Sequence, residues 1–226
     1  MGKLVNNIEN GERFPLRGQQ VFFNITNFCK RIFTFTVVSL SLLLLTPLLL
    51  LIALSIKSDG GSVLFRQKRV GYKGKLFTCY KFRTMVPNAE EVLHEYLRQH
   101  PEMEEEWNRN FKLKNDPRAT IVGKVLRKTS LDEVPQLWNV LKGDMNFVGP
   151  RPILPQEQVR YGDDFFYYAS VRPGITGIWQ VGGRSNTTFE DRVCMDVQYV
   201  KKQSLALDCK ILFKTIWVVF NGSGAS

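Results

Sequence analysis

Two adjacent carboxylates, Asp132 and Glu133, are the residues of this sequence best suited to carry out chemistry. An ionised carboxylate can attack phosphorus as a nucleophile. A neighbouring carboxylate can hold Mg²⁺, which offsets the repulsion between the attacking anion and an anionic substrate. The pair therefore predicts a site for chemistry on a phosphorylated substrate.

The same region also has a purely structural interpretation. Ser130 and Glu133 have the spacing of a capping box, in which they would only begin a helix. Pro135 weakens that interpretation, because proline is disfavoured inside a helix and favoured at its first position. We therefore expect a helix that begins at Pro135 and ends near Gly143. Asp132 would then lie just before the helix N-terminus, where the helix dipole favours an anion.

Several arginines lie beside turns rich in glycine and proline and could bind a diphosphate. Arg151 stands between Pro150 and Pro152, so its backbone is stiff and its guanidinium group can be aimed at a phosphate in advance. For each arginine alone, an incidental position on a rigid surface turn is the alternative. The other candidates are Arg127, Arg172 and Arg184.

Composition limits the number of domains and the kinds of partner. The 226 residues are enough for one catalytic domain. With 31 Lys and Arg against 21 Asp and Glu, the formal net charge of +10 suits a membrane surface, a nucleotide or a nucleic acid, without choosing among them. The 4 cysteines show no CxxC spacing and there are only 2 histidines, so neither a zinc site nor a disulfide framework is indicated.

An uncharged segment from Ile32 to Ile56 is long enough to cross a bilayer. Pro47 lies inside it and predicts a break in the helix, where the hydroxyl of Thr46 could satisfy a freed carbonyl. Basic residues flank the segment at both ends, beginning with Lys30 and Lys57. The positive-inside rule therefore favours a re-entrant helix with both ends on the cytoplasmic face. A single straight span is the alternative.

The rest of the chain predicts a mostly helical α+β domain that contains a β-hairpin. Residues 62–67 and 76–82 are rich in β-forming side chains and flank a turn at 71–75. A helical stretch begins near Pro87, and Pro101 interrupts it. The apolar run from Ile211 to Phe220 is too short to span a bilayer and predicts either a core helix or a helix in the membrane interface.

Together these elements predict a monotopic membrane protein with a re-entrant helix broken at Pro47 and a small cytoplasmic catalytic domain. The expected parts are a polar N-terminal segment (1–31), the membrane helix (32–56), the catalytic domain with an interfacial C-terminal helix (57–220) and a tail (221–226).

These motifs resemble the bacterial sugar transferases, the monotopic phosphoglycosyl transferases that begin polysaccharide assembly. Within that family the chain looks similar to the undecaprenyl-phosphate galactose phosphotransferases. The matching stretches occur in family order and are Tyr80 to Met85, Lys114 to Arg118, Arg127 to Asn139, Gly149 to Pro152, Arg172 to Gly177 and Gln180 to Arg184.

The resemblance implies a ping-pong mechanism at the inner membrane of a bacterium, on its cytoplasmic face. Asp132 would attack the sugar-bearing phosphate of a UDP-sugar, UMP would leave, and undecaprenyl phosphate would then accept the phosphosugar. Glu133 would bind the cofactor Mg²⁺. The implied partners are the UDP-sugar, undecaprenyl phosphate and membrane lipid, without nucleic acid, and an oligomer is possible. The implied substrate-binding residues are Lys81, Arg118, Arg127, Arg151, Arg184 and, more weakly, Asp196.

Several alternatives stay open at this point. A glycosyltransferase that releases UDP would use similar residues, and a non-catalytic basic membrane anchor would not need Asp132 at all. The sugar is assigned to galactose by resemblance alone, with glucose or an N-acetylated hexosamine as alternatives. Larger members of the family carry further N-terminal domains, so we expect this chain to be either a short form or the catalytic part of a longer protein.

Overall fold

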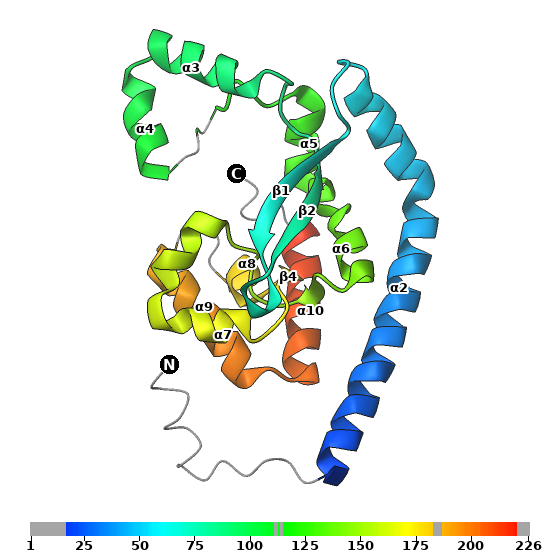
Figure 1. The fold of residues 1–226 in the computed structure, drawn as a ribbon. Coiled ribbons are helices and arrows are strands. Elements are labelled where there is room, and N and C mark those ends of the chain that lie inside the picture. Colours follow the sequence, from blue (N-terminus) through cyan, green and yellow to red (C-terminus); the bar gives the residue numbers. More distant parts are fainter. Residues whose placement is uncertain (1–16, 111–112, 114, 183–186, 221–226) are drawn as a thin grey trace. The chain divides into compact units, whose positions relative to one another are not determined.

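The structure is a computed structural model that describes residues 17–110, 113, 115–182 and 187–220 (Figure 1). It divides into two units, residues 1–41 and 42–226, and helix α2 (Arg17–Lys57) runs through the boundary between them. The larger unit is a mostly helical α+β domain with small sheets, as the sequence predicts.

Helix α2 differs from its prediction in two ways. It begins at Arg17, well before Ile32, because no proline or glycine interrupts the chain between Gly18 and Pro47. It also continues through Pro47, so the predicted break is wrong for this structure. A proline removes only one hydrogen bond of the ladder, and a long apolar helix can tolerate that loss. The Thr46 hydroxyl donates a hydrogen bond of 2.8 Å to the carbonyl of Leu42.

The apolar part of α2 is long enough for a membrane. The stretch Thr34–Lys57 has a mean hydropathy of 2.7, and by length and composition it could cross a bilayer. Several of its leucines are exposed, among them Leu43, Leu44 and Leu54. An exposed apolar surface of this kind is typical of a segment that contacts lipid.

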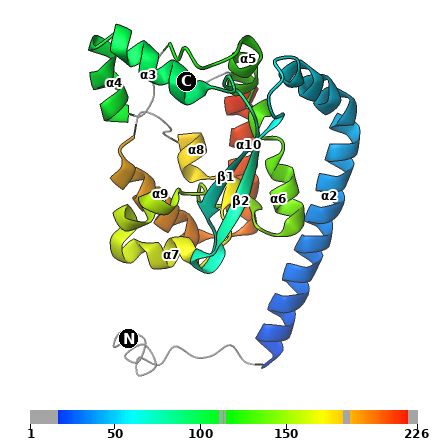
Figure 2. The same ribbon diagram turned by 45° about the horizontal axis from the view of Figure 1, so that its top comes forward.

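The hairpin follows the apolar segment of α2, as predicted. Strands β1 (Leu64–Val70) and β2 (Leu76–Phe82) pair antiparallel, and Leu64 lies opposite Phe82. The turn between them contains η1 (Tyr72–Gly74). In both ribbon views the hairpin lies between α6 on one side and the α7 to α9 region on the other (Figures 1 and 2).

The remaining elements surround this hairpin. Pro101 separates two helices, as predicted. The helices are α3 (Ala89–Gln99), α4 (Glu102–Asn110), α5 (Ile121–Thr129), η2 (Leu131–Glu133), α6 (Gln136–Lys142), η3 (Pro155–Asp164), α7 (Phe165–Ala169), α8 (Ile178–Gly182), α9 (Phe189–Lys202) and α10 (Leu205–Phe220). Two short strands, β3 (Asn146–Val148) and β4 (Gly174–Thr176), pair parallel.

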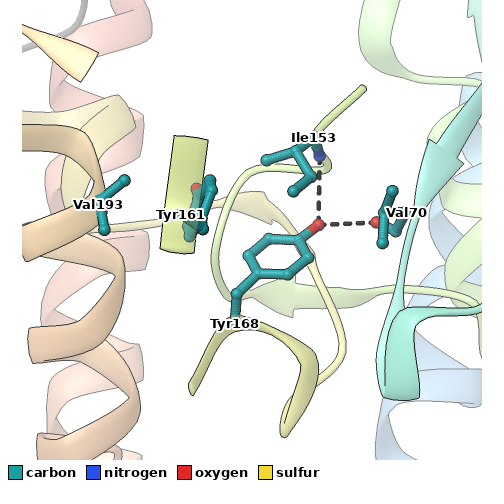
Figure 3. Close-up of a cluster of buried hydrophobic side chains, with 5 residues drawn as sticks. All are labelled: Val70, Ile153, Tyr161, Tyr168 and Val193. Carbon is teal, nitrogen blue, oxygen red and sulfur yellow. Dashed lines mark hydrogen bonds between the residues drawn. The ribbon is translucent and has the colours of Figure 1, made fainter. Parts of the chain in front are cut away.

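One buried cluster fixes the turn end of the hairpin to the helical layer (Figure 3). The hydroxyl of Tyr168 donates a hydrogen bond of 2.7 Å to the Val70 carbonyl and accepts one of 3.2 Å from the Ile153 amide. Tyr161 and Val193 complete the cluster. These bonds satisfy backbone groups of β1 and of the segment after Arg151, so they hold both segments in register.

A second cluster joins the end of α2 to the hairpin and to α5. Ile52 and Ile56 of α2 pack with Phe82 and Leu126, and Leu131 packs against the same cluster. The residue that follows Leu131 is Asp132. The end of α2 therefore shares one hydrophobic cluster with the segment that carries the carboxylate pair.

Helix α10 has one buried face and one exposed apolar face. Ile211 is buried, where it joins Val148 and Tyr199. On its other side Phe213, Ile216 and Trp217 are 74%, 54% and 69% exposed. One face of this helix thus contributes to the core, while the opposite face offers large apolar side chains to its surroundings.

Candidate active site

The carboxylate pair lies in a turn between two helices. Helix α5 ends at Ser130, which has a left-handed backbone with a φ of 57°, and η2 carries Asp132 and Glu133. Helix α6 then starts at Gln136, with Pro135 as its N-cap and Gly143 as its C-cap. The predicted position of the pair just before this helix is confirmed. The capping-box interpretation is wrong, because the Ser130 side chain makes no cap hydrogen bond.

Lys81 of β2 contacts both carboxylates. Its Nζ lies 2.5 Å from Glu133 Oε1 and 4.0 Å from Asp132 Oδ2. All three side chains are partly buried, between 14% and 25% exposed. Because burial weakens the screening of charges by water, this lysine offsets much of the repulsion between the two carboxylates.

Burial dominates the protonation of Asp132. Desolvation raises the pKa of this carboxyl above its usual 3.8, while the charge of Lys81 lowers it, Glu133 raises it and Arg127 lowers it. A helix dipole would lower the pKa of Asp132. The pKa is raised instead, because α6 is short and the carboxyl is removed from water. An aspartate with less hydration is a better nucleophile once it has lost its proton.

The predicted Arg151 reaches the same site from the other side. Its Nη1 lies 3.9 Å from Glu133 Oε1, and its guanidinium lies over the ring of Trp179 at 5.6 Å from the ring centroid. Lys81 and Arg151 thus bring two cations to one carboxylate. An arrangement of this kind is suited to a further anion, such as a phosphate of the substrate.

Close backbone contacts fix the turn that carries Arg151. Gly149 donates to the Thr176 carbonyl at 2.9 Å, and Gly174 donates to the Pro150 carbonyl at 2.8 Å. A Cβ atom on Gly174 would lie 2.1 Å from the Gly149 nitrogen. Only glycine allows these two segments to approach so closely, which explains why glycine stands at position 149 in one segment and at position 174 in the other.

Arg127 lies close enough to Asp132 to act on its charge, and its predicted contact with a phosphate stays a prediction. Its Nε donates a hydrogen bond of 2.9 Å to Thr84 Oγ1, and its charge lowers the pKa of Asp132. Thr84 directly follows Arg83 at the end of the hairpin. Arg127 therefore belongs to the electrostatic environment of Asp132.

The structure places two other predicted arginines in contact with groups of the protein itself. Arg118 is buried, binds Asp116 through two hydrogen bonds of 2.8 Å and stacks on Trp107. Arg172 donates to the Gly143 carbonyl at the end of α6. Arg184 lies outside the described residues. A role of Arg118 or Arg184 in substrate binding stays a prediction.

Asp196 lies inside the helical layer. It is 2% exposed, accepts a hydrogen bond of 2.7 Å from the Tyr161 hydroxyl and lies 3.9 Å from Arg192 Nε. Burial raises the pKa of this carboxyl to about 6. These contacts suit a residue that orders η3 and α9, and its predicted contact with substrate stays a prediction.

The sequence did not reveal a positioning residue, Asn139. This side chain is fully buried in α6, donates to the Thr78 carbonyl at 2.7 Å and accepts from the Tyr80 amide at 3.1 Å. Asn139 therefore makes the hydrogen bonds to the β2 backbone that a neighbouring strand would otherwise make, immediately before Lys81. An asparagine on a short helix gives no sequence signal of such a contact, since its partners lie about sixty positions away.

Two further arginines near Arg151 were also missed. Arg69 donates to the Pro152 carbonyl, and the charges of Arg151 and Arg192, after burial, lower its pKa. Arg192 is buried and lies over the Trp179 ring at 5.1 Å. The Arg151 turn is therefore surrounded by positive charge, which strengthens its attraction for an anionic substrate.

The carboxylates suit Mg²⁺ shared with a substrate. Among the described residues, no group of three or more His, Cys, Asp or Glu side chains could hold a metal ion. Mg²⁺ is usually bound by one or two carboxylates together with substrate phosphates and water. Asp132 and Glu133 fit that pattern, and Glu133 would hold the ion beside the Lys81 ammonium.

The carboxylate pair does not line the cavity that lies beside α3. A cavity of about 390 Å³ runs along α3 and is lined by Asn88, Glu91, Val92, Glu95, Tyr96, Gln99 and Pro117. None of the predicted site residues lines it. We therefore assign the site by its charge arrangement, because a cavity without those charges offers nothing for phosphate chemistry.

Comparison with known proteins places the chain in a family. The sequence profile of the bacterial sugar transferases matches residues 25–222. The chain is 50% identical over 200 residues to an undecaprenyl-phosphate galactose phosphotransferase of Salmonella typhimurium, and 48% identical over 200 residues to a UDP-galactose-lipid carrier transferase of Erwinia amylovora. Each alignment covers 88% of this chain and 42% of the relative, so the chain spans less than half the length of these two proteins.

A shorter relative matches along most of its length. The exopolysaccharide production protein ExoY of Rhizobium meliloti is 47% identical over 202 residues, which cover 89% of this chain and 89% of that protein. The described part of the matched region contains α2 from residue 25 onward, the hairpin and the carboxylate pair. This chain belongs to the bacterial sugar transferase family.

Proposed function

We propose that this protein transfers a sugar 1-phosphate from a UDP-sugar to undecaprenyl phosphate and so begins the assembly of a polysaccharide. In the first step an Asp132 carboxylate oxygen attacks the phosphorus that bears the sugar. The bond between this phosphorus and the bridging oxygen of the diphosphate breaks, and UMP leaves with that oxygen. In the second step a phosphate oxygen of the lipid attacks the same phosphorus and releases Asp132.

The observation that carries this proposal is the contact of Lys81 with both carboxylates. The positive charge of Lys81 reduces the repulsion between the two adjacent carboxylates and so stabilises both at one partly buried site. Lys81 and Arg151 can neutralise charge on the phosphates while Asp132 attacks. Arg127 lowers the pKa of Asp132 and so favours its nucleophilic form.

Mg²⁺ completes the proposal as a cofactor. Glu133 would hold the ion together with the substrate phosphates. When bound, it would polarise the diphosphate and stabilise the charge that develops on the leaving UMP.

We predict that the protein releases UMP from its sugar donor. The names of two similar proteins specify galactose, so UDP-galactose is the donor that we propose. In a screen with UDP-galactose, UDP-glucose and UDP-N-acetylated hexosamines, we expect UMP release to be fastest with UDP-galactose. Removal of Mg²⁺ with a chelator should stop it.

The nucleotide product separates this reaction from glycosyl transfer. UDP as the sole nucleotide product would contradict the mechanism, because it requires the sugar to leave without its phosphate. A faster reaction with another UDP-sugar would overturn only the choice of galactose. Release of neither nucleotide in the presence of undecaprenyl phosphate would favour a non-catalytic membrane anchor.

We further propose that the apolar part of α2 holds the protein in a bacterial inner membrane as a re-entrant segment, with its catalytic domain on the cytoplasmic face. Basic residues precede and follow the segment, and both groups would then face the cytoplasm. Helix α2 is continuous through Pro47 in this structure, so the return to that face would need a bend of the helix in the bilayer, and a proline in a helix favours such a bend.

Cysteine labelling tests this topology. In a variant without its native cysteines, we expect single cysteines at Gln20 and at Lys68 to react with a membrane-impermeant maleimide in inside-out vesicles only. Labelling of the Gln20 site in right-side-out vesicles, with the Lys68 site protected there, would show instead that the helix spans the bilayer.

A further inference from the structure

Arg83 forms an extensive polar link at the junction of the membrane helix and the catalytic domain. It directly follows β2 and is 8% exposed. We propose that Arg83 is a positioning residue that fixes the end of the membrane helix relative to Lys81 and the carboxylate pair, so that a lipid phosphate can reach Asp132. This inference rests on the proposed function and concerns its second step.

The guanidinium group of Arg83 connects three segments. Its Nε donates to the Ser62 carbonyl at 2.6 Å, and Nη1 donates to the Met85 carbonyl at 2.9 Å. Its Nη2 donates to the Ile56 carbonyl at 3.0 Å, in the last turn of α2. Only arginine offers so many donors in a fixed plane, which is why one side chain can hold both the helix end and the strand end.

Asp59 completes the link. Its two carboxylate oxygens accept hydrogen bonds from Nη1 at 2.8 Å and from Nη2 at 2.5 Å, and Oδ1 also accepts the Gly61 amide at 3.0 Å. The hydrogen bond from Arg83 is the main cause that lowers the pKa of this carboxyl to about 2. Asp59 therefore stays ionised across the pH range of a bacterial cytoplasm, and the link does not depend on pH there.

Strand β2 connects this link to the active site. Lys81 lies two residues before Arg83, and the intervening Phe82 packs against Ile52 and Ile56 of α2. If the end of α2 moved relative to β2, the α2 surface that would contact lipid would therefore change its position relative to the Lys81 ammonium. Since Lys81 contacts both carboxylates, the pair would shift as well.

Packing does not fill the α5 side of this junction. A cavity of about 160 Å³ lies there, and it is lined by Ser55, Ile56, Ser58, Asp59, Arg83, Thr120, Ile121 and Val122. The α2 end and the start of α5 are thus incompletely packed against each other at this place. The hydrogen bonds of Arg83 supply a constraint that close packing would otherwise provide.

The two steps of the reaction should depend on this constraint to different degrees. A water-soluble UDP-sugar can approach Asp132 whatever the orientation of α2. A lipid phosphate is held at the bilayer surface, so it reaches Asp132 only if α2 places the pair at the right height. Arg83 should therefore matter for the second step and much less for the first.

The test compares Arg83→Lys with the wild type in lipid nanodiscs. In the variant we expect the burst of UMP without acceptor to keep its amplitude within about twofold. The rate of phosphosugar transfer to undecaprenyl phosphate should fall roughly ten- to a hundredfold. Asp59→Asn, which keeps the size of the side chain, should show the same split with a smaller loss.

A matched control is Arg98→Lys, because Arg98 is an exposed arginine paired with Glu95 on α3. It should leave both steps unchanged. An equal loss of both steps in Arg83→Lys, or no loss of either, would overturn the proposal.

A distance measurement between α2 and α5 tests the proposal independently of the catalysed reaction. With spin labels at Leu51 on α2 and Val125 on α5, both exposed, we expect Arg83→Lys to broaden the distribution of distances while the melting temperature stays within a few degrees. An unchanged distribution would overturn the positioning role. Absence of a UMP burst in the wild type would refute the covalent mechanism instead, and the spin-label result would still decide the role of Arg83.

Discussion

Replacement of Asp132 by asparagine should reduce phosphosugar transfer by roughly 10³-fold or more, because an amide is not a nucleophile toward phosphorus. Asparagine has nearly the same size and adds no atom to this partly buried position, so the fold should persist. Intact-mass spectrometry after incubation with UDP-galactose and Mg²⁺ should detect the added phosphosugar on the wild-type protein and none on Asp132→Asn.

Asp163→Asn is the matched control for this experiment. Asp163 is an exposed aspartate at the end of η3, and its loss should change neither turnover nor labelling. Full turnover by Asp132→Asn would refute the covalent mechanism. A phosphosugar adduct that persists in the Asp132 variant would place the nucleophile at another residue.

Replacement of Lys81 by methionine should reduce turnover at neutral pH by about 10²-fold, since it removes a cation positioned for the substrate phosphates. It should also move the acidic limb of the pH–rate profile to higher pH. Burial raises the pKa of Asp132 and the charge of Lys81 lowers it, so loss of Lys81 raises that pKa further. Asp132 attacks in its ionised form, and activity is therefore lost as the pH falls through this pKa.

The profile of UMP release without acceptor, recorded from pH 4 to pH 8, measures both effects. Lys68→Met is the control, because Lys68 is an exposed lysine on β1 of the same hairpin. Its profile should coincide with that of the wild type. A Lys81→Met enzyme with a lower rate but an unmoved acidic limb would show that Lys81 binds substrate without acting on the protonation of Asp132.

Signals that act over a few residues could be interpreted from the sequence. Pro135 placed the carboxylate pair before α6 correctly, and Gly143 ends that helix with a φ of 80°. The hairpin and the interruption at Pro101 were also predicted correctly. In each case backbone sterics of proline and glycine, or alternation of side chains, determine the local structure without help from distant residues.

The same local reasoning was wrong where a longer helix can compensate. Pro47 predicted a break, yet α2 continues through it, because neighbouring turns of a 41-residue helix remain bonded. Arg118 stood in a motif together with Asp116, and the structure shows that the two bind each other. A motif thus indicates which residues matter without telling whether a side chain meets substrate or its own neighbour.

The sequence by itself determined the carboxylate pair, the rigid Arg151 turn, the long apolar segment and the hairpin. Only the tertiary structure decided that Lys81 contacts both carboxylates, since it lies 52 positions from Glu133, and that Arg83 binds Asp59 and the end of α2. Charges attract in every direction and at any separation along the chain, so spacing in the sequence does not reveal their partners. The folding of β2 against η2 and α2 selected those partners, and it placed a chemically suitable pair of carboxylates beside cations and close to the end of the apolar helix.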